Sequence, residues 1–246
     1  MAIQIEAASG THIGDKREQQ DRLVVAPMPG QRGVLMAVVA DGMGGLSGGT
    51  MAAEEVVSTS TRLFQAWSPA SEPGEALLRA VAEEAHVAIR LARFTSEQEP
   101  HSTIVALVLN GERADWAHSG DSRLYHFRGT RLASRTVDHS YVEQLYREGK
   151  IGAAERDTHP QRNLLVSCLG ARESPRLDLG SAADLRPGDS FLLCSDGLWA
   201  YFSESELGAV LAGLAPRPAA EKLIAAARVR AKGNGDNASL VIVKVS

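Results

Sequence analysis

Four aspartates in this sequence stand where a predicted strand meets a turn. Asp41 and Asp196 each end an apolar run and are followed by glycine, whereas Asp236 lies in a glycine-rich turn before the last apolar run. Asp121 follows a weaker strand pattern at residues 113–118. Each feature alone is most simply an ordinary turn. Four of them in a chain with hairpin connections indicate carboxylates that converge at one edge of stacked sheets.

Carboxylates gathered beside bare glycine carbonyls, such as that of Gly42, favour a hard divalent cation. All-oxygen ligand sets select Mg²⁺ or Mn²⁺, whereas zinc prefers histidine and cysteine. The residues by themselves therefore indicate a site for hard divalent cations. A cysteine nucleophile is not indicated, because no basic residue adjoins Cys194 in the sequence to favour its thiolate.

Composition restricts the class of protein. The chain has 246 residues, of which 44% are hydrophobic, enough for a sizeable core. Its net charge of -4 argues against a nucleic-acid-binding protein, because such domains carry a basic surplus. Its apolar runs are too short to span a bilayer, and residues 1–6 lack the pattern of a signal peptide. With two cysteines, Cys168 and Cys194, we expect no disulfide framework, no membrane partner and a cytoplasmic location.

Strands and helices predicted from hydrophobic periodicity would position these aspartates. Strand patterns occupy residues 3–8, 22–26, 34–40, 102–109, 113–118, 122–127, 190–194 and 239–245. Helical patterns occupy residues 50–67, 74–94, 140–148, 203–213 and 218–231. Short turns between consecutive strands, such as Asn110-Gly111 and Arg128-Gly129, indicate antiparallel pairing. We therefore expect an α+β fold in one domain over residues 1–246, a four-layer α-β-β-α sandwich of two antiparallel β-sheets flanked by helix pairs.

One segment departs from these patterns. Residues 152–163 are polar, with almost no large apolar side chains, and lie between a helical pattern and the apolar run 164–166. Such a segment has little to contribute to a core. We therefore expect an exposed flap spanning about residues 140–165.

Short motifs along the chain resemble those of the metal-dependent protein phosphatase (PPM, type 2C) family, in its bacterial form. The motifs are Gly14-Asp15-Lys16-Arg17-Glu18-Gln19-Gln20-Asp21, Asp41-Gly42-Met43-Gly44-Gly45, Gly120-Asp121-Ser122-Arg123, Asp138-His139-Ser140, Ser195-Asp196-Gly197-Leu198-Trp199 and Asp236-Asn237-Ala238-Ser239. They follow the family's order and cover nearly the whole chain. The resemblance implies a Mn²⁺- or Mg²⁺-dependent phosphatase that hydrolyses phosphoserine and phosphothreonine in proteins by direct attack of a metal-bridging hydroxide.

The resemblance also implies a role for each matched residue. Asp41 matches the aspartate that bridges two cations, one of which also binds the carbonyl of Gly42. Asp121 matches an acid that helps to bind a third and weaker cation in bacterial members. The remaining matches are Asp196 and Asp236, which complete the ligands of the first cation, and Asp21, which holds metal-bound water.

A positive side chain must also hold the phosphoryl group. The family places a phosphate-binding arginine in its N-terminal motif, where this sequence has Lys16 and Arg17. Spacing from Gly14 to Asp21 favours Lys16, whereas side-chain type favours Arg17, because a guanidinium grips phosphate with two hydrogen bonds. Both residues are kept as candidates.

Two positions differ from many family members. Gln20 precedes Asp21 where an acidic residue is common, and Met43 stands where eukaryotic members have a histidine that can protonate the leaving group. Bacterial members often differ at both places. Thr103 resembles a position behind the metal site, and Trp199 is assigned to core packing.

The expected partners are phosphorylated Ser/Thr proteins, with a cognate bacterial Ser/Thr kinase as the opposing enzyme and a monomer as the working form. One alternative is a phosphatase dedicated to a single regulatory partner, for example in a secretion-system or anti-sigma pathway. Another is a catalytically weak interaction module. The intact aspartates argue against the second alternative, whereas the first shares the same site residues and is left open.

Overall fold

The strands form two sheets in which every neighbouring pair is antiparallel. The computed structural model describes residues 3–45, 48–93 and 99–246. One sheet has the order β1-β11-β10-β7-β8, formed by β1 (Ile5–His12), β7 (Arg123–Arg128), β8 (Arg131–Arg135), β10 (Asp189–Cys194) and β11 (Ala238–Val245). The other has the order β2-β3-β5-β6-β9 with β4 beside β3, formed by β2 (Asp21–Pro27), β3 (Val34–Met43), β4 (His101–Ser102), β5 (Ile104–Asn110), β6 (Arg113–Ser119) and β9 (Asp178–Ala182).

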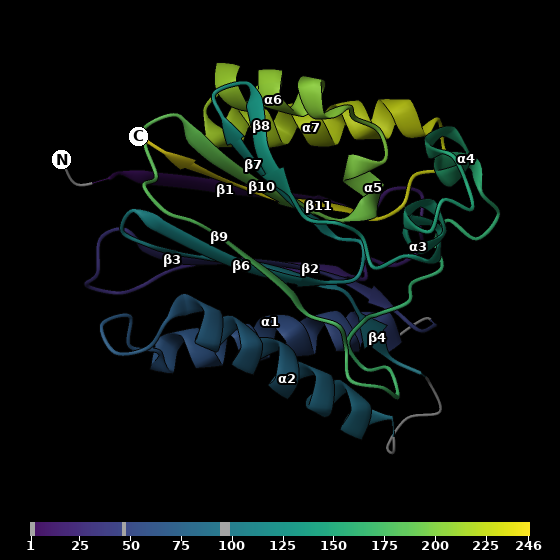
Figure 1. Ribbon diagram of the computed structural model, residues 1–246, viewed down its shortest axis with the longest axis horizontal. Coiled ribbons are helices and arrows are strands. Elements are labelled where there is room, and N and C mark those ends of the chain that lie inside the picture. The colour runs from purple at the N-terminus through teal and green to yellow at the C-terminus, as the bar shows by residue number, and fades with distance from the viewer. Residues whose placement is uncertain (1–2, 46–47, 94–98) are drawn as a thin grey trace.

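Helices cover the outer face of each sheet (Figure 1). The β2-β3-β5-β6-β9 sheet is covered by α1 (Gly48–Ala66) and α2 (Gly74–Ala92), and the other sheet by α6 (Glu204–Gly213) and α7 (Pro216–Ala231). The expected four-layer α-β-β-α sandwich is therefore confirmed. None of the helices in residues 3–45, 48–93 and 99–246 has the length and apolar character that crossing a membrane requires.

Strand β3 shows how the sequence builds this core. Residues 34–40 are all buried, because one face of the strand packs on helices and the other on the second sheet. Alternate residues belong to different apolar clusters, Val34, Met36, Val38 and Ala40 to the one under α1 and α2, and Leu35, Ala37 and Val39 to the one between the sheets. Each large aliphatic side chain so buried contributes about 1.5–3 kcal/mol. The strand is thus fixed on both faces up to the point where it delivers Asp41.

Most predicted elements appear with ends shifted by a few residues, and the exceptions have physical reasons. The predicted strand over residues 102–109 is divided at Thr103, whose N–H bonds to the carbonyl of Asp41 and so leaves the regular pairing. Strands β8 and β9 lie at sheet edges and are rich in polar or small residues, so they give no apolar signal. The predicted helix end at Phe94 lies outside the described residues.

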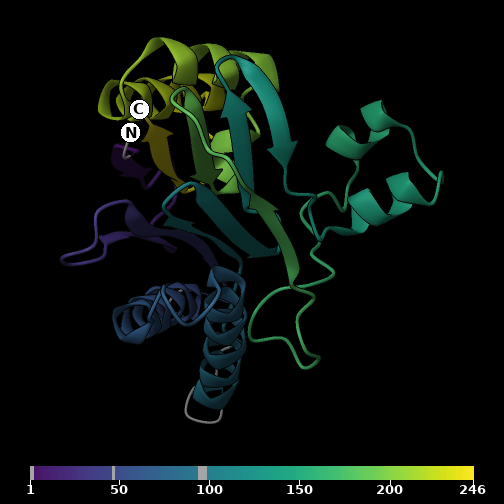
Figure 2. The same ribbon diagram turned by 60° about the vertical axis from the view of Figure 1, so that its left-hand side comes forward.

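The segment expected as a flap contains two short helices that project from one edge of the sandwich (Figure 2). They are α3 (Tyr141–Arg147) and α4 (Ala153–Thr158). Ser140 caps α3 by accepting a hydrogen bond from the N–H of Glu143 at 3.3 Å. The periodicity of the sequence missed α4, which is short and has exposed residues at 153–155.

Candidate metal centre

The expected aspartates meet at one end of the sandwich. Asp21 and Asp41 face each other in the pairing of β2 with β3. Asp196 begins α5 (Asp196–Trp199) directly after β10, and Asp236 lies in the loop that leads into β11, the neighbour of β10. The hydroxyl of Ser195 donates a 2.7 Å hydrogen bond to Asp21 Oδ2, which joins the two sheets at this point.

The Asp21 carboxylate favours a positive ligand at this end of the sandwich. Asp21 is 3% exposed, and its Oδ1 has no hydrogen-bond partner among the residues that the structure describes. Burial raises the pKa of Asp21 to about 7, and Asp196 and Asp236 add to this effect against the opposing interactions with Ser195 and Ser239. An unsatisfied buried acceptor costs about 1–3 kcal/mol, and more when it is charged. A cation beside Oδ1 removes that cost.

The other carboxylates disfavour one another's charged forms. Burial, followed by Asp21 and Asp196, raises the pKa of Asp41 well above its ordinary value. Burial and then Asp236 raise the pKa of Asp196 to about 6. Divalent cations neutralise such a cluster, and its all-oxygen donor set fits Mg²⁺ or Mn²⁺ better than zinc.

Two glycines allow the loops that carry the aspartates to approach each other. A Cβ on Gly42 would collide with the carbonyl oxygen of Gly49 in the first turn of α1. A Cβ on Gly197 would collide with the carbonyl oxygen of Asn237, beside Asp236. Because both contacts are with main chain, a side chain at either place would push the aspartate next to it out of position.

Of the two candidate phosphate-binding residues, Lys16 lies at the carboxylate cluster. Lys16 Nζ donates a 2.8 Å hydrogen bond to Asp236 Oδ2. This bond, and the charges of Asp236, Asp196 and Asp41, raise the pKa of Lys16 against the opposing effect of burial. Arg17 is exposed, and its side chain makes no ion pair with the residues that the structure describes.

Asp121 is brought to the same region by the turn after β6. Burial, followed by Asp196 and Asp138, raises the pKa of Asp121 well above its usual range. Thr103 connects the turn to Asp41, because its Oγ1 accepts a hydrogen bond from Asp41 N at 3.0 Å and bonds to Ser122 Oγ at 2.8 Å. The sequence placed Thr103 behind the expected metal site. In the structure, Thr103 links the segments that carry Asp41 and Asp121.

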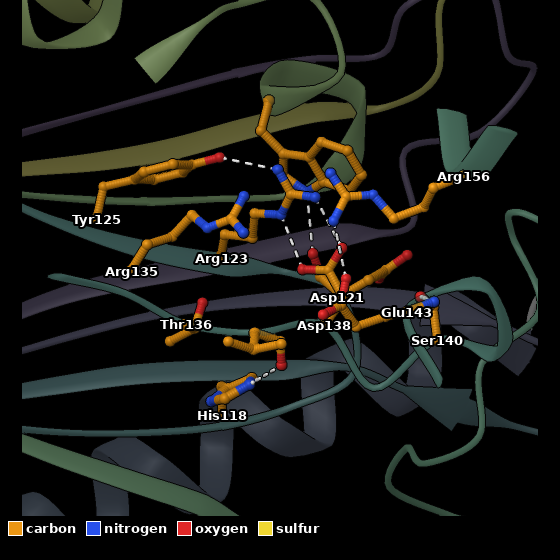
Figure 3. A network of polar contacts seen from close by, with 12 residues as sticks. His118, Asp121, Arg123, Tyr125, Arg135, Thr136, Asp138, Ser140, Glu143 and Arg156 are labelled. Carbon is orange, nitrogen blue, oxygen red and sulfur yellow. Dashed lines mark hydrogen bonds and ion pairs between the residues drawn. The ribbon is translucent and has the colours of Figure 1, made fainter. Parts of the chain in front are cut away.

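A second polar network lies between Asp121 and the flap (Figure 3). Arg123 binds Asp138 with two hydrogen bonds, from Nε at 2.8 Å and from Nη2 at 2.7 Å. In the flap, Arg156 Nη1 donates to Glu143 Oε2 at 2.9 Å. Sequence reasoning gave these residues no role, because the only available signal was that Arg123 and Asp138 lie within motifs of the resemblance.

Three groups outside the aspartate cluster are close enough to hold a cation, namely His118, His139 and Asp178. His139 Nδ1 accepts a hydrogen bond from the N–H of Gly120 at 3.3 Å, so in the neutral ring Nε2 carries the proton, 3.3 Å from Asp178 Oδ2. That tautomer has no nitrogen lone pair free for a metal. Burial, and then His118, lower the pKa of His139 to about 4, so the neutral ring is the form present at neutral pH. We therefore assign no cation to this cluster, in which Asp178 is paired with Arg176 at 2.7 Å.

The cysteines offer no nucleophile. Cys194 is fully buried in β10, and burial raises the pKa of its thiol. Burial also raises the pKa of Cys168 to about 11, with a further contribution from Asp121. Both are free thiols, which are poor nucleophiles in this protonated state.

Comparisons with known proteins agree with this geometry. A family model described as Protein phosphatase 2C matches residues 10–231. Serine/threonine protein phosphatase PstP of Mycobacterium tuberculosis is 32% identical over 220 residues, 87% of this chain and 41% of PstP, so the chain spans about two fifths of that relative's length. Protein phosphatase PhpP of Streptococcus pneumoniae is 30% identical over 243 residues, 96% of either chain.

The fold is also similar to a solved structure, the catalytic domain of PstP in complex with two manganese ions. That structure is 27% identical, with 99% of both chains covered and a TM-score of 0.78. The family model covers well over half of the present sequence and includes all of the aspartates discussed above except Asp236. The chain therefore belongs to the protein phosphatase 2C family.

Proposed function

We propose that this protein is a Mn²⁺- or Mg²⁺-dependent protein serine/threonine phosphatase. The observation that carries the proposal is the buried Asp21 oxygen without a hydrogen-bond partner among the described residues, set in a cluster with Asp41, Asp196 and Asp236. The all-oxygen donor set supports two Mn²⁺ or Mg²⁺ ions, and the two manganese ions in the PstP catalytic domain support the same assignment.

The residues would divide the work as follows. Two cations held by these residues would supply an activated water as nucleophile and would neutralise charge on the phosphate. Asp41 would bind both of them, and the Gly42 carbonyl, Asp196 and Asp236 would be further ligands. Asp21 Oδ1, free of other hydrogen bonds in the described chain, is proposed to orient water, and Asp121 with Asp196 to hold a third, weaker cation.

The proposed substrates are phosphorylated Ser/Thr proteins, in line with the printed names of PstP and PhpP. A cognate bacterial Ser/Thr kinase would phosphorylate the same proteins. We further propose that residues 1–246 work as one phosphatase domain and as a monomer, with residues 140–165 as a flap beside the site. The two free cysteines fit a reducing cytoplasm.

The proposal is tested by metal-dependent hydrolysis. Purified protein should hydrolyse p-nitrophenyl phosphate and a phosphothreonine peptide with added Mn²⁺, and EDTA should abolish both activities. A phosphotyrosine peptide of the same sequence is the matched comparison and should be a much poorer substrate. Turnover that survives EDTA would contradict the metal mechanism, and equal turnover of the two peptides would contradict the substrate class.

A pair of substitutions decides between Lys16 and Arg17. At saturating Mn²⁺ we expect Lys16→Met to raise KM for the phosphothreonine peptide about tenfold, because a charge-assisted hydrogen bond to phosphate is lost. Arg17→Met should change KM by less than about twofold, since Arg17 is exposed and unpaired with the described acidic residues. Steady-state kinetics of both variants provides the comparison, and a larger effect at Arg17 would reverse the assignment.

A further inference from the structure

Trp199 connects two of the carboxylate-bearing segments. It is the last residue of α5, the helical turn that Asp196 begins. Its indole Nε1–H donates a 2.9 Å hydrogen bond to the main-chain carbonyl of Asp121. The short helix α5 therefore carries a predicted cation ligand, Asp196, at its first residue. Its last residue, Trp199, holds the main chain of a second predicted ligand, Asp121.

The orientation of the indole is fixed independently of this hydrogen bond. The guanidinium carbon of Arg123 lies 3.4 Å from the centroid of the Trp199 ring, a cation–π contact. Arg123 is itself held by its two hydrogen bonds to Asp138 and by a 3.1 Å bond from Nη1 to the hydroxyl of Tyr125 (Figure 3). The Arg123 and Asp138 side chains are each 12% exposed, so the stack is shielded from water.

The residue before Asp121 is also held in place. The carbonyl of Gly120 accepts a hydrogen bond from His139 N at 2.9 Å, and a Cβ on Gly120 would lie 2.6 Å from the Thr103 methyl carbon. Gly120 has φ of +109°, which only glycine adopts readily. The turn is therefore anchored on its N-terminal side, and the Trp199 N–H is the contact that fixes the carbonyl of Asp121 itself.

We propose that Trp199 is a positioning residue for the third cation. Its N–H holds the main chain of Asp121 in the position where its carboxylate and that of Asp196 can bind the same cation. This preorganisation sets the affinity of the third and weakest cation site. The inference rests on the proposed function, because it requires a third cation there. Without the hydrogen bond, the segment that carries Asp121 is free to move away from Asp196 before the cation binds.

The test is calorimetric titration of Mn²⁺ into metal-free protein. Trp199→Phe keeps a ring for Arg123 to stack on and removes the N–H. We expect the weakest class of Mn²⁺ sites to bind about fivefold less tightly in this variant, the effect of one neutral hydrogen bond, with the two tighter classes unchanged. Trp67→Phe is the matched control, because Trp67 Nε1 donates a similar 3.0 Å bond to the carbonyl of Glu72 in the connection between α1 and α2.

Three further results decide the matter. The proposal would be overturned if Trp199→Phe bound Mn²⁺ with wild-type affinity in every class of sites. It would also be overturned if every class lost the same affinity, because a general packing defect gives that pattern. Trp199→Phe added to Asp121→Ala should have no further effect on Mn²⁺ binding, and an additional loss would also overturn it. If wild-type protein binds only two Mn²⁺ ions, the proposal fails while the two-metal site stands.

A second replacement separates the hydrogen bond from ring size, in case the smaller phenylalanine ring prevents folding. 3-Benzothienylalanine at position 199 keeps a bicyclic ring of the same shape and has sulfur in place of the N–H. It should reproduce the weakening of about fivefold in the third class alone. Wild-type binding by this variant would show that the ring, and not its N–H, matters, and would refute the proposal.

Discussion

Replacing Asp41 by asparagine is expected to abolish phosphatase activity while stabilising the metal-free protein. Asparagine has nearly the shape of aspartate but no charge, so it cannot bridge two cations. We expect kcat to fall by at least about a thousandfold, which corresponds to roughly 4 kcal/mol of transition-state stabilisation. In metal-free protein the same change replaces a carboxylate, whose charged form burial and the neighbours Asp21, Asp196 and Asp121 all disfavour, by a side chain that is neutral without a bound proton. We expect a gain of roughly 2 kcal/mol in the free energy of unfolding.

The measurement is the melting temperature in EDTA and in Mn²⁺. The variant should melt above wild type in EDTA and below it in Mn²⁺, because a ligand that binds only the folded state at a hundred times its Kd adds about 2.7 kcal/mol to wild type. Asp115→Asn is the matched control, since Asp115 is buried in β6 and paired with Arg113 at 2.6 Å, away from the cluster. It should lower the melting temperature and keep activity. If Asp41→Asn is as destabilising in EDTA as the control, the carboxylates do not repel one another as argued.

The stabilisation expected of Asp41→Asn follows from a feature that was visible in the sequence. Apolar runs that end in Asp-Gly are found where a covered strand leaves the core, and β3 and β10 both follow this rule. Antiparallel pairing of β10 with β11 then brings Asp196 beside Asp236. The hairpin turns at Asn110-Gly111 and Arg128-Gly129, which join β5 to β6 and β7 to β8, made antiparallel sheets predictable from the sequence, although not this particular pair of strands.

The features of the site that could not be predicted from the sequence depend on contacts between distant segments. Arg123 and Asp138 are 15 residues apart and meet only because β7, β8 and the start of the flap turn back on one another. Lys16 and Arg17 are adjacent and carry the same charge. Only the conformation of their loop decides which of the two side chains faces the carboxylate cluster. Trp199 satisfies the assignment to core packing by its ring contacts, yet its N–H reaches Asp121 through a turn that no local pattern encodes.

The stability of the metal-free protein is expected to fall as pH rises from about 7 to 8. Asp21 has a pKa of about 7 in the folded protein, and Asp41 is raised well above its ordinary 3.8, whereas both titrate near 3.8 when unfolded. The folded state therefore binds more protons than the unfolded state across this window. The stabilising contribution is fully present below the unfolded pKa and is lost as pH rises through the folded pKa, by about 1.4 kcal/mol per pH unit for each proton.

The window must lie above about pH 7 because buried histidines act in the opposite direction at lower pH. Burial lowers the pKa of four histidines, which favours the folded state as they lose their protons, namely His86, His118, His126 and His139. An unfolded histidine is half protonated at about pH 6.5 and mostly neutral above about pH 7, so the opposing contribution of these rings is small there. The carboxylates then dominate the slope among these groups.

Urea unfolding at several pH values, with EDTA or with saturating Mn²⁺, measures this slope directly. Mn²⁺ should abolish or invert it, because cations compete with protons for the same oxygens and bind better as pH rises. Asp21→Asn should flatten the metal-free slope near pH 7 without a comparable change in Asp115→Asn. A metal-free stability that stays level or rises from pH 7 to 8 would mean that these carboxylates are ionised in the folded protein without a cation. In that case Asp21 Oδ1, which has no hydrogen-bond partner among the described residues, would no longer support a metal centre.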